Sequence, residues 1–273
     1  MPSLKGYLDD LRWRALTVTR SLYPLGSVKA FLWLLLSSIP RTILSKQMHL
    51  RSLVEHVKDQ LCADLFIQVN GIKFRCVDSE SLKILSPTYE SQVWRHLNLE
   101  RGDVFIDVGA HVGKYTLKAS KVVGEGGLVV AIEPHPKNYR YLLENIKLNG
   151  LKNVVALNLA AWSDRCKVKL FVSEKAGQHS VKKDSKRGYI YIQADTLDNI
   201  LGKLNVEKVD AMKIDVEGAE VEVLKGALST LIKHHPRIVI EAWDVKGIKQ
   251  LADKIGYKMK QIEQDHYLLG GCF

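Results

Sequence analysis

Near the middle of the chain, a short apolar stretch ends in an acidic residue and two glycines. The segment runs Asp107-Val108-Gly109-Ala110-His111-Val112-Gly113. Glycines let a chain turn sharply from a strand into a helix and let its backbone approach a ligand closely. The spacing differs from the G-x-G-x-x-G of pyrophosphate loops, and a carboxylate before the glycines suits a ligand with a cationic part. We therefore predict a nucleotide-type site, with a tight turn that binds nothing as the structural alternative.

The ends of the next two expected strands suit the rest of a nucleoside. Glu133 stands 26 residues after Asp107 (133 − 107), where a doubly wound sheet places an acid for a ribose diol. Ala160 and Ala161 leave room for a flat adenine, and Asp164 is a candidate partner for its amino group. The structural alternatives are a solvated acid at a strand end and an ordinary loop.

Several carboxylates gather where a later strand ends, in the string KIDVEGAE with Asp215, Glu217 and Glu220. Ligand crevices of open α/β sheets form at the carboxyl ends of their strands. We predict that Asp215 or Glu217 orients an acceptor group and removes its proton. Alternatively, Asp215 caps the next helix and the two glutamates are first-turn acids, the interpretation that we prefer for Glu220.

Two further possibilities concern the same reaction. His179, in a polar loop, is another candidate base. Asp215 and Glu241 both end strands and offer oxygen ligands for magnesium, but no third ligand is evident. We therefore expect no metal.

The elements that must position these residues alternate between apolar strands and helices from Asp103 onwards. The expected strands are VFIDVG, LVVAIE, NVVALNL, DAMKID and RIVIEAW, and the expected helices are residues 114–123, 137–149 and 219–232. Continuously apolar strands joined by helices indicate a parallel sheet covered on both faces. GYKMKQIEQ and HYLLGG add an antiparallel pair, and KVKLFV with YIYIQA form an inserted hairpin. We predict a doubly wound, seven-stranded, mostly parallel Rossmann-like α/β core over residues 85–273.

Before this core we expect a basic helical segment over residues 1–62 and a β-hairpin over residues 63–78. Asn70-Gly71 is typical of a tight hairpin turn. The apolar run AFLWLLLSSIP is too short to span a bilayer. The helical segment is either a cap that packs its Leu and Trp face on the core or a region that docks on an anionic membrane or a protein.

Composition narrows the class of protein. The 273 residues are 46% apolar and 26% charged, which is typical of a chain with a large core and excludes a disordered one. The net charge of +10 favours anionic partners, but we find no stacking-aromatic module or basic recognition stretch and expect no nucleic acid partner. The cysteines are too far apart for a paired zinc motif, and no secretory signal is evident. We expect a cytoplasmic protein, with a peripheral position at the inner membrane face as the alternative.

Four segments over about residues 85–243 resemble the FkbM-type family of S-adenosylmethionine-dependent methyltransferases: FIDVGAHVGKYTL, AIEPHP, ADTLD and MKIDVEGAEVEVLKGA. The resemblance implies a methyltransferase domain over residues 63–273 with S-adenosylmethionine as cofactor. It implies that Asp107, Gly109 and Gly113 hold the methionine part, that Glu133 holds the ribose, and that Glu90 approaches the cofactor. His111 stands where this family commonly has Asn.

The resemblance also implies O-methylation of a hydroxyl on a glycan, a lipid-linked sugar or a small metabolite. Three alternatives stay open at this point. They are an NAD-type oxidoreductase, which the missing third glycine disfavours, a docking module without enzymatic activity, and methylation of protein or nucleic acid.

Overall fold

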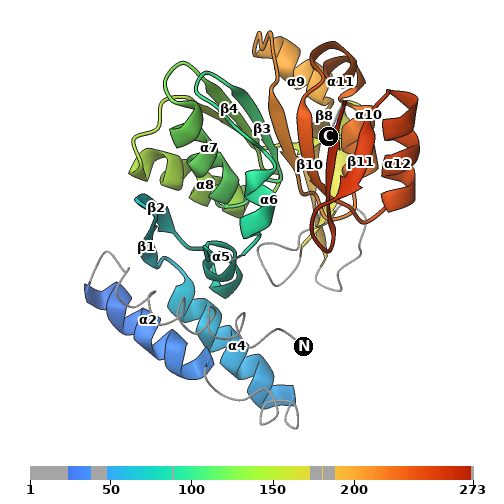
Figure 1. The fold of residues 1–273 in the computed structure, drawn as a ribbon. Helices are drawn as coiled ribbons and strands as arrows, with labels where there is room; N and C mark the ends of the chain where they lie inside the picture. Colours follow the sequence, from blue (N-terminus) through green and yellow to red (C-terminus); the bar gives the residue numbers. More distant parts are fainter. Residues whose placement is uncertain (1–23, 38–47, 88, 173–179, 181–187, 272–273) are drawn as a thin grey trace. The chain divides into compact units, whose positions relative to one another are not determined.

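The computed structural model describes residues 24–37, 48–87, 89–172, 180 and 188–271. The chain divides into two compact units, Met1–Glu90 and Ser91–Phe273 (Figure 1). In the part of the chain that the structure describes, every helix is too short or too polar to cross a membrane.

The first unit contains two helices that pack against each other, followed by a hairpin and a short helix. Its elements are α2 (Pro24–Ser37), α4 (Met48–Cys62), β1 (Phe66–Val69), β2 (Ile72–Arg75) and α5 (Ser79–Ile84). The strands β1 and β2 pair antiparallel, and Asn70 and Gly71 both have positive φ, at 50° and 75°. The predicted hairpin and its tight turn are therefore confirmed.

The hairpin lies in the first compact unit, and the expected domain boundary between residues 62 and 63 stays a prediction. Hydrogen bonds connect the hairpin to α4. The N–H of Leu65 donates to the carbonyl of Cys62 at the end of α4, and the N–H of Asp64 donates to the carbonyl of Cys76. The N–H of Ser79 donates to the carboxylate of Asp59, also on α4. These hydrogen bonds attach the hairpin and α5 to the C-terminal end of α4.

The second unit is built on a seven-stranded sheet of order β11-β12-β10-β9-β3-β4-β5. All its strand pairs are parallel except those that β12 makes with β10 and β11. The strands are β3 (Val104–Val108), β4 (Leu128–Ile132), β5 (Val154–Leu157), β9 (Ala211–Ile214), β10 (Arg237–Glu241), β11 (Lys258–Gln261) and β12 (His266–Gly270). The predicted fold class, an α/β fold with a mostly parallel seven-stranded sheet, is confirmed.

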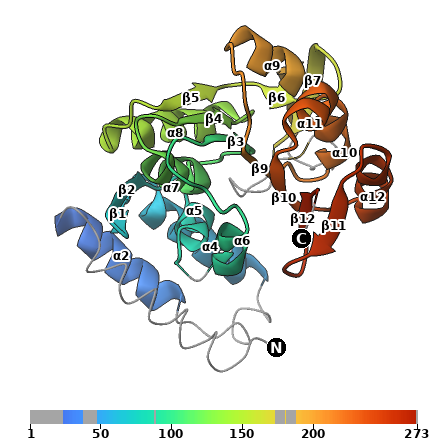
Figure 2. The same ribbon diagram turned by 45° about the horizontal axis from the view of Figure 1, so that its top comes forward.

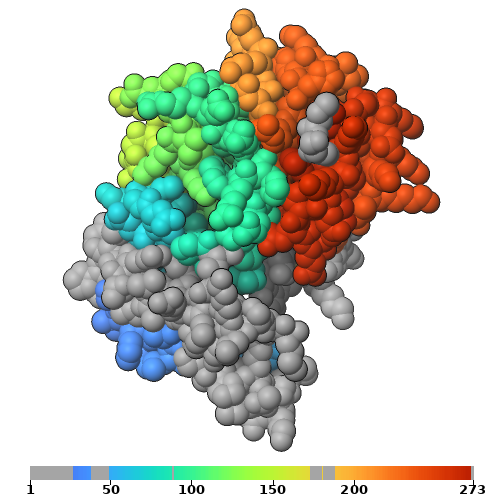
Figure 3. Space-filling model, in the orientation of Figure 1, coloured from blue at the N-terminus to red at the C-terminus, as the bar shows by residue number. Residues whose placement is uncertain are grey.

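Helices cover both faces of this sheet, because strand residues alternate between two apolar clusters. Phe105 and Val129 pack with α6 and α7, while Ile106 and Val130 pack on the other face with α9 to α12 (Figure 2). The helices are α6 (Ser91–Arg95), α7 (Lys114–Val123), α8 (Pro136–Leu148), α9 (Leu197–Lys203), α10 (Glu220–Lys225), α11 (Leu228–His234) and α12 (Val245–Lys254). Segments near residue 100 and the C-terminal segments lie side by side on the surface of this unit (Figure 3).

Two details of the second unit concern the expected elements. The strands β6 (Ala160–Ala161), β8 (Tyr189–Asp195) and β7 (Cys166–Phe171) form a small sheet in which β7 and β8 are the predicted antiparallel hairpin. The expected helix over residues 219–232 is instead broken into α10 and α11. A Cβ on Gly226 would overlap the carbonyl oxygen of Trp162, and the carbonyl of Gly226 accepts the N–H of Asp198. The chain therefore turns at Gly226 to pack on these neighbours.

Candidate active site

Four predicted site positions share one row at the carboxyl edge of the sheet. Val108 pairs with Ile132 on β4 and with Ile214 on β9, and Ile214 pairs with Ile240 on β10. The residues that follow these four strand ends therefore lie side by side at this edge. These next residues are Glu133, Gly109, Asp215 and Glu241. The sheet thus brings together residues that lie up to 132 positions apart (241 − 109).

Gly109 and Gly113 both have left-handed backbones, with φ of 87° and 95°. A Cβ on Gly109 would overlap the carbonyl oxygen of Asp215, and a Cβ on Gly113 would overlap the side chain of Leu117. The N–H groups of Gly109 and Ala110 both donate to the carbonyl of Ile132. Protein packing therefore already requires Gly109, and the left-handed backbone favours glycine at position 113. Contact of either glycine with a cofactor stays a prediction.

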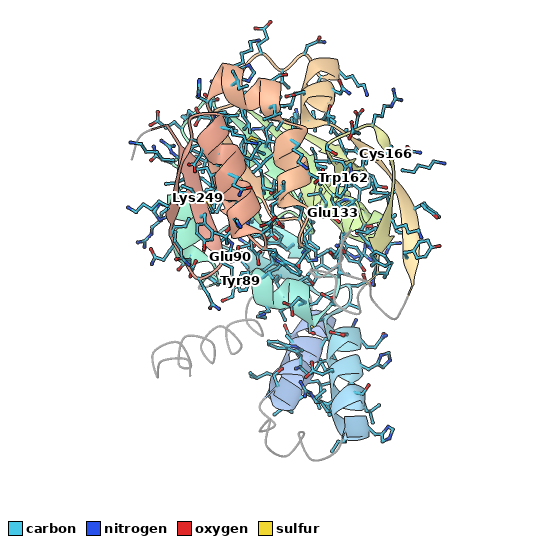
Figure 4. The ribbon with its side chains drawn as sticks, turned by 90° about the vertical axis from the view of Figure 1, so that its right-hand side faces the viewer. Tyr89, Glu90, Glu133, Trp162, Cys166 and Lys249 are labelled. Carbon is cyan, nitrogen blue, oxygen red and sulfur yellow. The ribbon has the colours of Figure 1, made fainter. Side chains whose placement is uncertain are left out.

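Glu133 is buried, with 4% of its surface exposed, and its carboxylate is held by the two segments beside it. The N–H of His111 donates to Oε2 at 2.8 Å and the N–H of His135 donates to Oε1 at 2.9 Å. The side chain of Asn138 also reaches Oε1, at 3.5 Å. Burial raises the pKa of Glu133 to about 7, against the opposing effect of these donors (Figure 4 labels Glu133).

His111 has a left-handed backbone, with φ of 52°. Asn, Asp and His adopt this conformation more readily than other non-glycine residues. The backbone therefore suits either His or the Asn that the resemblance led us to expect here, and the N–H of His111 donates to Glu133.

Asp107 lies on β3 beneath the glycine turn, with 2% of its surface exposed. Its Oδ2 accepts a short hydrogen bond from the hydroxyl of Thr116 on α7. Burial raises the pKa of Asp107 to about 6, while Thr116 and the positive charge of Lys213 act in the opposite direction. Its predicted contact with the cofactor is not visible in these bonds and stays a prediction.

Lys213 is a functional candidate that sequence reasoning missed. Its side chain is 1% exposed, and its Nζ lies 3.3 Å from Oδ2 of Asp215 and 5.5 Å from the centre of the Tyr115 ring. A lysine is almost never fully buried unless it is paired. The signal was available, because Lys213 interrupts an otherwise apolar strand in AMKI.

Asp215 and Glu241 form a carboxyl pair beside Lys213. Burial acts to raise the pKa of Asp215, but Lys213, a hydrogen bond from Glu241 and the charge of His266 together lower it. Burial and then the charge of Asp215 raise the pKa of Glu241 to about 9. At neutral pH, Asp215 is thus ionised and Glu241 is a neutral donor to it. Asp215 keeps 29% of its side chain exposed.

The turn after β9 has an unusual backbone at two consecutive residues. Glu217 and Gly218 have positive φ, at 52° and 102°. The carbonyl of Glu217 accepts the hydroxyl of Ser180 at 2.6 Å, and the carboxylate of Glu220 accepts the N–H of Gly218 at 2.6 Å. The charge of Glu217 also raises the pKa of Glu241, after the larger effects of burial and Asp215.

These contacts decide between some of the alternatives for the acids. The helix α10 begins at Glu220 with Ala219 as its N-cap, so Asp215 is not the cap of this helix. Glu220 is fully buried and fixes the turn, which agrees with its structural interpretation.

The remaining predicted positions are spread more widely. Ala161 is buried in β6, which pairs with β8, and Asp164 is exposed and accepts the hydroxyl of Ser163. Glu90 is the last residue of the first unit and has φ of 52°. His179 lies outside the described residues. Within the described ranges, no group of three or more His, Cys, Asp or Glu side chains is placed to hold a metal.

Comparison with known proteins identifies a family. Residues 107–263 match the model of the methyltransferase FkbM domain. Methyltransferase sdnD of Sordaria araneosa is 27% identical over 184 residues, covering 56% of this chain and 71% of that protein. The hexuronic acid methyltransferase AglP of Haloferax volcanii is 29% identical over 197 residues, covering 70% of this chain and 79% of its own length.

A solved structure, methyltransferase FkbM from Methylobacillus flagellatus KT, aligns with a TM-score of 0.48 at 15% identity. The alignment covers 97% of this chain but 60% of that one. The family match lies wholly within the second unit and includes every residue of the row at the carboxyl edge of the sheet. The chain therefore belongs to the FkbM methyltransferase domain family, and residues 107–263 of its second unit form the methyltransferase domain.

Proposed function

We propose that this protein transfers a methyl group from S-adenosylmethionine to a hydroxyl of a sugar, on a glycan, a lipid-linked sugar or a small metabolite. The observation that carries the proposal is Asp215 at the carboxyl edge of the sheet, partly exposed and 3.3 Å from the buried Nζ of Lys213. The similarity to a hexuronic acid methyltransferase supports a sugar as the acceptor.

At the carboxyl edge of the sheet, Glu133 offers hydrogen-bond acceptors that suit the ribose of S-adenosylmethionine. Glu133 is a buried carboxylate with two backbone N–H donors, and a carboxylate has lone pairs for further hydrogen bonds from ribose hydroxyls. Asp107, Gly109, Gly113, Ala161 and Glu90 are the other proposed contacts. When it is bound, S-adenosylmethionine supplies a methyl group on a positively charged sulfur.

Asp215 is proposed to orient the acceptor. Because Lys213 and Glu241 hold its pKa low, Asp215 is a weak base but a strong hydrogen-bond acceptor. It would therefore align the acceptor hydroxyl first and take its proton as the hydroxyl loses electron density to the methyl group. Glu217, two residues after Asp215 in the turn that follows β9, is proposed as the second carboxylate for the same proton.

The test replaces Asp215→Asn and measures transfer of labelled methyl from S-adenosylmethionine into a cell extract. The extract is divided into lipid, glycan, protein and RNA fractions. We expect wild-type label in the glycan, lipid or small-molecule fraction and a loss of about 100-fold in the variant. Asp253→Asn, an exposed acid on α12, is the matched control and should keep full activity.

Two results would contradict this assignment. If Asp215→Asn transfers methyl groups as fast as Asp253→Asn does, the proposed role of Asp215 is refuted. Label that enters only protein or RNA would refute the sugar acceptor and leave the methyltransferase domain as assigned.

We further propose that the first unit docks on an anionic membrane, because α2 presents an apolar stripe. Val28, Phe31, Leu32 and Leu35 follow the i, i+3, i+4, i+7 spacing of one helix face, and each is between 43% and 56% exposed. Ala30 and Trp33 are buried, so the stripe is a second apolar face in addition to the packed one. Such a helix can lie in a membrane surface.

A further inference from the structure

The inserted hairpin of β7 and β8 carries aromatic and basic side chains on one face and apolar side chains on the other. The register pairs Lys167 with Gln193, Lys169 with Tyr191 and Phe171 with Tyr189, and these six residues share a face because side chains alternate along a strand. We call this the ladder face. The opposite face packs Leu170, Ile192 and Ala194 into a small core. The ladder face thus contributes little to folding.

The three aromatic rings of the ladder face stand in a row. The Phe171 and Tyr189 ring centres are 6.0 Å apart, and those of Tyr189 and Tyr191 are 5.4 Å apart, in edge-to-face arrangements. Tyr189 is 46% exposed and Tyr191 is 62% exposed, which is unusual for two adjacent aromatic residues. Lys169 holds its Nζ 4.3 Å from the centre of the Tyr189 ring and 6.0 Å from that of Tyr191.

One end of this row is tied to the turn that follows Asp215. The backbone of Phe171 pairs with Ser180 through hydrogen bonds in both directions. Ser180 is buried, and its hydroxyl donates to the carbonyl of Glu217 at 2.6 Å. The Phe171 and Tyr189 end of the ladder face is therefore anchored two residues from the proposed acceptor site.

We propose that the ladder face binds the sugar chain whose terminal hydroxyl is methylated, and that this chain carries carboxylates. The proposal rests on the proposed function and names the substrate class of the same site. The C–H faces of pyranose rings are apolar and pack on tyrosine rings, whose hydroxyls bind sugar hydroxyls. Among its described side chains, this face has two lysines and no acid, so its charge is complementary to a uronic acid.

The test measures binding by titration calorimetry, without cofactor and without turnover. The probes are an oligogalacturonate and a hyaluronan fragment as acidic sugar chains, a neutral malto-oligosaccharide, and a short poly(U) RNA. The variants are Tyr191→Ala and Lys169→Ala. The matched controls are Ile232→Ala, also an exposed apolar residue, and Lys254→Ala, an exposed lysine on α12.

We expect wild type to bind at least one acidic chain and the malto-oligosaccharide more weakly. Tyr191→Ala should lower the affinity for the acidic sugar chain by about fivefold to tenfold, because the ring contact is lost. Lys169→Ala should lower the affinity for the acidic sugar chain and leave the affinity for the malto-oligosaccharide unchanged. Both control variants should bind all probes with wild-type affinity.

Three outcomes would overturn the proposal: no binding of either acidic chain, equal binding by the ladder variants and the controls, or poly(U) as the tighter ligand. S-adenosylmethionine is titrated in parallel. If the wild-type protein does not bind S-adenosylmethionine, the proposed function is refuted. The sugar titrations would still show whether the ladder face binds acidic sugar chains.

Discussion

At the scale of single residues, the site is defined by carboxyl groups in different protonation states. Asp215 is kept ionised by Lys213, while Glu241 is kept neutral by burial and by the charge of Asp215. Two like charges this close disfavour joint ionisation, and one proton shared between them removes the conflict. Lys213, Glu217 and His266 also act on this pair, and the charge of Asp215 in turn raises the pKa of Asp107 and of Glu220.

The protonation of Glu241 gives a pH prediction. Its pKa rises from an ordinary 4.5 in the unfolded chain to about 9, so the folded protein binds the extra proton between these values. The stability from this group is complete below pH 4.5 and is lost as the pH rises through 9. Glu241→Gln copies the neutral form, so the free energy of unfolding of the variant minus that of wild type should increase from pH 5 to pH 9. Urea unfolding across this range measures it, and a constant difference would contradict the assigned protonation.

Gly109 gives a prediction about packing. Its left-handed φ and the carbonyl of Asp215, which a Cβ at this position would overlap, leave no room for a side chain. Gly109→Ala should lower the free energy of unfolding by roughly 3 kcal/mol or more, from strain and displaced backbone. Gly126→Ala is the control, since nothing would lie within 4 Å of its Cβ. Equal urea midpoints for the two variants would contradict the close contact between Gly109 and the carbonyl of Asp215.

At the scale of elements, the sequence predicts well whatever depends on local periodicity. The strands and the helix over residues 114–123 were found because apolar runs alternate with amphipathic ones. The break between α10 and α11 was missed because it depends on Gly226 meeting Trp162, a contact that no local pattern shows. The hairpin over residues 66–75 was predicted from Asn70-Gly71, but its attachment to α4 depends on tertiary hydrogen bonds.

The exposed stripe of α2 belongs to this scale and predicts vesicle binding. Replacing both Phe31→Ser and Leu35→Ser removes two exposed apolar side chains, each of which can contribute about 1.5–3 kcal/mol on full burial. Co-sedimentation with phosphatidylserine-containing vesicles should fall by at least about tenfold. Ile232→Ser, an equally exposed residue of the second unit, should sediment as wild type does. Equal sedimentation of all three proteins would exclude docking through α2.

At the scale of the whole molecule, the parallel sheet assembles the site from distant segments. The sequence predicted a mostly parallel sheet, and the observed strand order places Glu133, Gly109, Asp215 and Glu241 side by side. The network around Lys213 could not be predicted, because it depends on which face of the sheet each side chain enters and on Tyr115 and Thr116 from α7. The sequence therefore identified Asp215 and Glu241, but it did not identify Lys213, whose positive charge keeps the pKa of Asp215 low.

The most direct test of the account titrates the full chain with S-adenosylmethionine in a calorimeter, beside NAD and beside the Glu133→Ala variant. We predict one binding event for S-adenosylmethionine, none for NAD, and an affinity at least about tenfold weaker in the variant, because the proposed ribose acceptor is lost. Heat for NAD with none for S-adenosylmethionine would contradict the account.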